Sequence, residues 1–134
     1  MKKLLYIVIW FLLSAMHCVV EHIPHVRTTY YNWSNHNLYI RAFNEGKIAY
    51  EIFIIAGTNF SFKDETKAVT PLIVLIADSA VVTFEDGKKL WYADNQISPT
   101  NQNLLSIGGY DYFKSTDINN FQYAFTNEHY LKAQ

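Results

Sequence analysis

The sequence is poor in cysteine, proline and glycine. Its 134 residues include one Cys, three Pro and five Gly. A single cysteine excludes a framework of internal disulfides, and so little Pro and Gly excludes collagen-like and low-complexity chains. The sequence also has no large excess of positive or negative charge, because it contains 11 basic and 12 acidic residues and no basic patch stands out. We therefore expect no nucleic-acid partner.

Motifs for catalysis or for cofactor binding are missing as well. The pair Gly108-Gly109 lacks the lysine and the following helix of a phosphate-binding loop. His36 and His129 have no nucleophile at a recognisable spacing, and the other three histidines lie within residues 17–25, where a preorganised metal site is not expected. We expect the protein to bind no cofactor and no metal ion and to have no enzymatic activity. A hydrolase with two converging carboxylates ranks last among the function hypotheses.

The first residues have the pattern of an export signal. Lys2 and Lys3 form a charged region, and Leu4 to Ala15 form an uninterrupted apolar stretch of twelve residues. A transmembrane helix needs about 20 apolar residues, so this stretch is too short for a permanent span. We predict a signal peptide over residues 1–17.

The only cysteine, Cys18, directly follows this segment. Residues 13–18 look like a bacterial lipobox, although His17 stands where a small residue is usual. The sequence therefore predicts lipidation of Cys18, a tether over residues 18–26 and one domain over residues 27–134. The predicted location is the cell envelope, at the outer membrane or in the periplasm, with a lipid anchor. The alternative is cleavage elsewhere, for instance after Ala15, which would give a secreted domain.

Residues 78–92 contain the strongest fold signal, two alternating apolar runs joined by a glycine turn. A two-residue turn at Asp86-Gly87 would mix apolar and polar side chains on both faces. A three-residue turn closing on a left-handed Gly87 makes Val82 oppose Leu90 and leaves one face apolar. We predict this bulged register.

Other strands are predicted from period-two alternation and from turn signals between the runs. Residues 38–56 form a second hairpin around Asn44-Glu45-Gly46, and Leu72 to Ile76 form either a buried strand or an apolar linker, being too few for a stable helix. Thr126 is expected to cap a short helical turn near the C-terminus. The pattern predicts an all-β chain of six to seven short strands arranged as an antiparallel β-sandwich.

Three motifs resemble those of small uncharacterised lipoproteins of Bacteroidetes-type bacteria. They are the hairpin from Asp78 to Tyr92, the Asn103-Leu104-Leu105 step, and the ending from Tyr123 to Tyr130. The similarity covers roughly residues 36–133; Glu85 stands where that group usually has Asp, and His129 where it usually has an acidic residue. The resemblance implies an immunoglobulin-like β-sandwich behind a lipidated cysteine and implies no activity.

An aromatic surplus without a catalytic motif is the main functional signal. With 3 Trp, 10 Tyr and 9 Phe, the chain can supply rings both to a core and to a binding surface. The binding candidates are Trp33, Trp91, Tyr110 and Tyr112; the alternative is that Trp91 is covered by a neighbouring loop or by the second sheet. The sequence thus predicts a non-enzymatic envelope lipoprotein that binds a protein or a glycan. The alternative is an immunity or inhibitor protein that neutralises a toxin or a protease.

Overall fold

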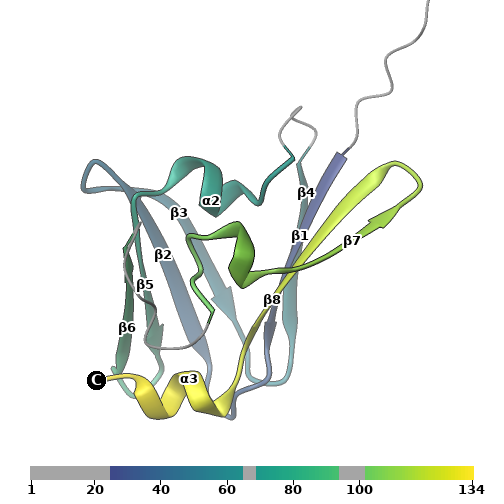
Figure 1. Ribbon diagram of the computed structural model, residues 1–134. Coiled ribbons are helices and arrows are strands. Elements are labelled where there is room, and N and C mark those ends of the chain that lie inside the picture. The colour runs from purple at the N-terminus through teal and green to yellow at the C-terminus, as the bar shows by residue number, and fades with distance from the viewer. Residues whose placement is uncertain (1–24, 65–68, 94–101) are drawn as a thin grey trace, which may run out of the picture.

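The computed structural model describes residues 25–64, 69–93 and 102–134. These residues contain eight strands, two short α-helices and one 3-10 turn (Figure 1). In chain order the elements are β1 His25–Asn32, β2 Leu38–Asn44, β3 Lys47–Ile54, β4 Asn59–Asp64, α2 Leu72–Ile76, β5 Ser79–Phe84, β6 Lys89–Ala93, η1 Ile107–Gly109, β7 Asp111–Ser115, β8 Ile118–Phe125 and α3 Asn127–Lys132. The predicted signal peptide, most of the tether and the predicted lipidation of Cys18 lie outside the described residues. No helix within the described ranges is long and apolar enough to cross a membrane.

The strands form two four-stranded sheets that pack face to face as a sandwich, so the predicted fold class is confirmed. One sheet, called sheet A, has the order β4-β1-β8-β7, and the other, called sheet B, has the order β3-β2-β5-β6. The described residues hold eight strands where six to seven were expected. Every pairing is antiparallel except that of β1 with β8, which is parallel and runs from His25 beside Ile118 to Asn32 beside Phe125.

The β5–β6 hairpin has the predicted bulged register. Val82 lies opposite Leu90 and Ala80 opposite Tyr92, and Gly87 takes a φ of 91°. The N–H of Phe84 donates to the carbonyl of Lys88 at 2.8 Å, which closes the turn. The left-handed glycine lets the ladder continue without moving the apolar face out of the core.

The β2–β3 hairpin is also present, but a bulge alters one of its faces. Its pairing shifts between Ala42 and Phe43, so that Ala42 pairs with Tyr50 while Phe43 pairs with Ile48. The sequence pattern alone would put Ile48 on the face of Ile52. The extra residue in β3 instead leaves Ile48 56% exposed, while Ile52 is buried.

Strand β1 includes two residues that lie before the predicted boundary at residue 27. His25 and Val26, which were expected in the tether, are the first residues of β1, and Val26 is buried. The N–H of His25 donates to the carbonyl of Asp117 at 2.9 Å. Strand β1 reaches back to His25 because the start of β8, together with the preceding Asp117, offers it a parallel partner.

Residues Leu72–Ile76 form a short α-helix, α2, and neither the expected strand nor an irregular linker. Its Ile73 is fully buried, and the N–H of Ala77 donates to the carbonyl of Ile73 at 3.0 Å. Five residues make a poor isolated helix, so tertiary packing of Ile73 supplies the stability that the sequence alone could not indicate.

The core lies between the inner faces of the two sheets. Its largest fully buried side chains include Tyr30 and Tyr123 from sheet A and Phe84, Leu38 and Ile40 from sheet B. Helix α3 lies across one end of the sandwich (Figure 1). Its first turn is capped as predicted.

Candidate functional site

The outer face of sheet B carries an ordered grid of side chains. The register places Tyr39, Thr83 and Lys89 in one cross-strand row. It places Arg41, Val81 and Trp91 in the next row, with Glu51 of β3 beside Arg41. Because the side chains alternate along each strand, every member of these rows points away from the core.

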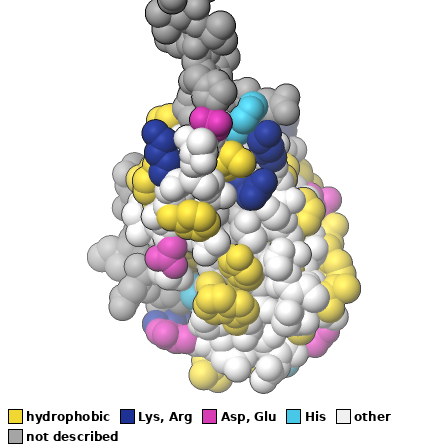
Figure 2. Space-filling model, turned by 90° about the vertical axis from the view of Figure 1, so that its right-hand side faces the viewer, with side chains coloured by type: hydrophobic (Ala, Val, Ile, Leu, Met, Phe, Trp, Pro, Cys, Tyr) yellow, Lys and Arg dark blue, Asp and Glu magenta, His cyan; other side chains and the backbone are white. Residues whose placement is uncertain are grey.

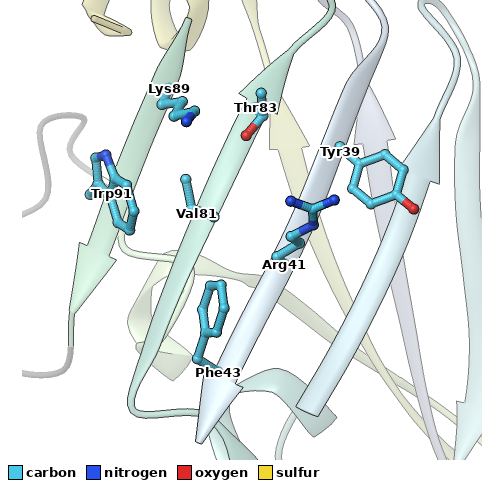
Figure 3. Close-up of a pocket in the computed structure, with 7 residues that line it drawn as sticks. All are labelled: Tyr39, Arg41, Phe43, Val81, Thr83, Lys89 and Trp91. Carbon is cyan, nitrogen blue, oxygen red and sulfur yellow. The ribbon is translucent and has the colours of Figure 1, made fainter. Parts of the chain in front are cut away.

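These rows surround a hollow of about 400 Å³ on the surface of β2, β5 and β6. We call it the trough and define it by the residues that line it, namely Tyr39, Arg41, Phe43, Val81, Thr83, Lys89 and Trp91 (Figure 3). Val81 is 5% exposed and forms the floor over the central strand β5. Trp91 stands on one side of this floor, and Arg41 and Phe43 stand on the other (Figure 3).

Arg41 is held in a fixed position within the trough. Its Nε donates to Oε1 of Glu51 at 2.7 Å, and its guanidinium carbon lies 5.1 Å from the centre of the Tyr39 ring. The hydrogen bond to Glu51 raises the pKa of Arg41 above its ordinary value. The guanidinium is therefore a permanent, oriented cation beside an aromatic surface.

The side chains of Trp91 and Trp33 are both exposed, so each is accessible to a ligand. Trp91 is 64% exposed on sheet B, and Trp33 is 62% exposed just after β1 of sheet A. The Trp33 ring lies 5.4 Å from the ring of Tyr31, and the backbone N–H of Trp33 donates to the carbonyl of Phe125 at 2.7 Å. The two tryptophans therefore belong to different surfaces and do not form one site.

Tyr110 is a core residue, contrary to its selection as a surface candidate. It is 7% exposed, and its hydroxyl donates to the carbonyl of Leu104 at 2.8 Å. Its ring packs edge-on against Tyr30, Phe121 and Tyr123. Burial raises the pKa of Tyr110 well above its ordinary value. Although Tyr110 directly follows Gly108 and Gly109, its ring anchors this segment to the core.

Tyr112 is exposed but lies in a separate place. It projects from edge strand β7 and is 55% exposed, with its hydroxyl donating to Oδ1 of Asn119 at 2.9 Å. It lines a second hollow of about 300 Å³ together with Val69, Ile107, Asn119 and Phe121. The described residues that line this hollow are mostly apolar and carry no charge. The predicted aromatic candidates thus fall into three separate environments and one core position.

The side of the molecule that presents β7, β8, β1 and β4 offers a different surface. Hydrophobic side chains are scattered among polar ones over this side, and Lys and Arg side chains gather at its upper end near a histidine (Figure 2). The register pairs Arg27 of β1 with Lys63 of β4 and places His25 nearby.

The two histidines outside the N-terminal segment both lie near helix α3. The His36 ring stacks on the ring of Tyr130 at 3.8 Å and its Nδ1 lies 3.4 Å from Oε1 of Glu85. Nδ1 of His129 accepts the N–H of Thr126 at 3.2 Å, which completes the helix cap. Burial lowers the pKa of His129 to about 4. Both histidines therefore have structural explanations.

Trp91 was predicted from the sequence as a binding residue, but its neighbours in the trough were not. The alternation of Tyr39, Arg41 and Phe43 against Leu38, Ile40 and Ala42 signals that the first three share a face. Likewise the bulged register puts Thr83, Lys89 and Trp91 together. Only the antiparallel pairing of β2 with β5 joins the two sets, and no local pattern encodes that pairing.

Comparisons of the chain with protein-family models, with curated proteins and with solved structures gave no match. The function therefore has to be inferred from the residues of this chain.

Proposed function

We propose that this protein is a non-enzymatic binding module of the cell envelope that holds a saccharide in the trough on sheet B. The observation that carries the proposal is the combination of an exposed Trp91 with the oriented Arg41 across a buried Val81 floor. Sugar rings present both apolar C–H faces and hydroxyl groups. An aromatic plane beside fixed hydrogen-bonding groups is suited to both.

The size and rigidity of the trough favour a small ligand or a short segment of a polymer. Its volume of about 400 Å³ lies at the lower end of the usual range for ligand sites. All seven lining residues stand on strands, which hold side chains more rigidly than loops do. A stable protein partner would instead cover about 800 Å² of this chain, far more than the trough alone offers.

The chemistry of the trough favours binding over hydrolysis. A glycosidase needs two carboxyl groups about 5 to 9.5 Å apart, on either side of the scissile bond. No carboxylate lines the trough in the part of the chain that the structure describes, and the adjacent Glu51 is engaged by Arg41. A saccharide in the trough would therefore be held and released without reaction.

The two exposed tryptophans allow a matched test. We expect Trp91→Ala to weaken saccharide binding at least 30-fold, which corresponds to the ~2 kcal/mol typical of a central aromatic contact. Trp33→Ala removes an equally exposed ring from the other sheet and should leave affinity unchanged. Binding to a panel of soluble neutral and acidic oligosaccharides would be measured by isothermal titration calorimetry.

A tag for these measurements belongs at the N-terminal side of the domain. Gln134 exchanges two backbone hydrogen bonds with Lys89 of the trough, at 2.7 and 3.0 Å, so a C-terminal tag would emerge beside the site. Equal loss of binding in both tryptophan variants, or no binding to any member of the panel, would contradict the proposal. A diffusible or anchored inhibitor of another protein would then become the leading alternative.

The envelope location is part of the same proposal and has its own test. We expect the protein extracted from host membranes to begin at Cys18 and to carry added acyl mass. A Cys18→Ala variant should lack that mass and leave the membrane fraction. If the chain is not acylated and begins at another residue, the proposed lipid anchor is wrong and the protein is secreted.

A further inference from the structure

The trough is more positively charged than the protein around it. The chain as a whole has a formal net charge of −1, yet among the described residues two cations and no carboxylate line the trough. Arg41 and Lys89 stand on β2 and β6, on either side of the central strand β5. In Figure 3 the Lys89 side chain points from β6 toward β5. A ligand lying over β5 would therefore meet positive charge from both sides.

Arg41 keeps most of its hydrogen-bonding capacity free. A guanidinium has five N–H donors, and only the one on Nε is used, by Glu51 at 2.7 Å. Within the described ranges the terminal nitrogens of Arg41 have no hydrogen-bond partner. Because Glu51 lies on β3, it holds Arg41 from the side away from β5. The unused donors thus form a preorganised fork next to the trough, and Glu51 acts as a positioning residue.

The distances across the sheet suit one ring with an acidic substituent. Strands β2 and β6 flank β5, so their backbones are about 10 Å apart at the ordinary spacing of sheet strands. A ring stacked on Trp91 would direct its substituents across Val81 toward Arg41. The planar fork of Arg41 matches the two oxygens of a carboxylate better than it matches a single hydroxyl group.

We infer that the trough selects saccharides that carry a carboxylate, with a sugar ring on Trp91 and the acidic group between Arg41 and Lys89. This inference rests on the proposed function and adds the class of saccharide. Charge complementarity distinguishes it from binding of neutral sugars, and a comparison with a sulfated probe distinguishes it from binding of sulfated sugars.

The test compares two forms of one polymer. Oligogalacturonate carries a carboxylate on each ring, and its fully methyl-esterified form has the same backbone without the charge. We expect calorimetry at low salt to show at least tenfold tighter binding of the acid. The preference should weaken as salt is added, because exposed charges are screened.

Variants of two arginines provide the control. Arg41→Gln should weaken binding of the acid at least tenfold and binding of the ester by a clearly smaller factor, because the ester loses a hydrogen bond to a neutral group and no ionic contact. Arg27→Gln removes an exposed arginine from the other sheet and should change neither. Arg41→Lys keeps the charge but loses the fork, so an intermediate affinity for the acid is expected.

The outcomes separate this inference from the proposed function. If acid and ester bind equally and Trp91→Ala abolishes both, saccharide binding stands and selection of a carboxylate is overturned. If a heparin fragment binds more tightly than every carboxylated probe that lacks sulfate, selection of a carboxylate is overturned and selection of a sulfate takes its place. If acid, ester and neutral oligosaccharides all fail to bind, the inference and the proposed function fall together.

Discussion

His129 makes stability depend on pH in a direction that the structure fixes. Its Nδ1 already accepts a hydrogen bond from Thr126, and its Nε2 is buried with no hydrogen-bond partner among the described residues. The rings of Tyr123 and Phe125 lie edge-on within 6.0 and 5.7 Å of the imidazole. Protonation would place a charge among these rings and would end the hydrogen bond that Nδ1 accepts from the N–H of Thr126.

Burial is the main cause that lowers the pKa of His129 from 6.5 to about 4, with a smaller opposing effect from Glu128 and a smaller reinforcing one from Lys132. Below pH 6.5 the unfolded chain binds a proton that the folded chain refuses, so stability falls as pH decreases toward 4. A shift of this size corresponds to about 3 kcal/mol in total. Roughly 2 kcal/mol of it is lost between pH 7.5 and pH 5.

The substitution His129→Gln isolates this contribution. A glutamine at the third position of a helix can accept the N–H of the capping residue as His129 does, but it does not titrate near neutral pH. At pH 7.5 the variant should be less stable, because it loses the packing of the imidazole against Tyr123 and Phe125. We call the difference between the unfolding free energies of the two proteins the stability gap. At pH 5 this gap should change by about 2 kcal/mol in favour of the variant.

Urea unfolding at both pH values, followed by the near-ultraviolet circular dichroism of the buried tyrosines, gives the two free energies. Carboxylates titrate in both proteins, so most of their contribution cancels in the difference. The same stability gap at pH 7.5 and pH 5 would refute the assignment of a buried, neutral His129.

Two further substitutions test the fold. Gly109→Ala should cost about 1 to 3 kcal/mol, because a Cβ at Gly109 would lie well inside 3.0 Å of the backbone of Asn103. Gly108→Ala meets only a side-chain oxygen at 3.7 Å and should cost less than about 0.5 kcal/mol in thermal unfolding, so equal losses would contradict the close approach. Asn32→Ala should cost about 3 kcal/mol in urea unfolding, because this buried amide donates to two backbone carbonyls and accepts two further hydrogen bonds. A loss below about 1 kcal/mol would show that these four bonds are replaced by water.

Local signals in the sequence were sufficient for the hairpins. The register of β5 and β6 followed from Gly87 and from the requirement that Val82 and Leu90 share a face. The cap at Thr126 was equally local. In each case neighbouring residues decide the geometry, so a pattern of a few positions contains the answer.

Long-range packing decided what the sequence could not. Helix α2 exists because Ile73 enters the core, and Tyr110 is buried because the segment before β7 folds back onto sheet A. The trough depends on Arg41 lying beside Val81, a pairing between distant segments. Alternation can place Trp91 on an exposed face of the sheet, but it cannot tell which strands are neighbours in that sheet.

The parallel pairing of β1 with β8 has a consequence for the order of folding. It joins residues near the start of the domain to residues near its end, as in the pairing of Val26 with Asn119. The central pair of sheet A therefore cannot form until nearly the whole domain has been synthesised. Closing so long a loop early is entropically costly, and folds rich in such contacts refold on the order of milliseconds to seconds. A chain that stops before β8 would leave one edge of β1 without its partner and open to association with other chains.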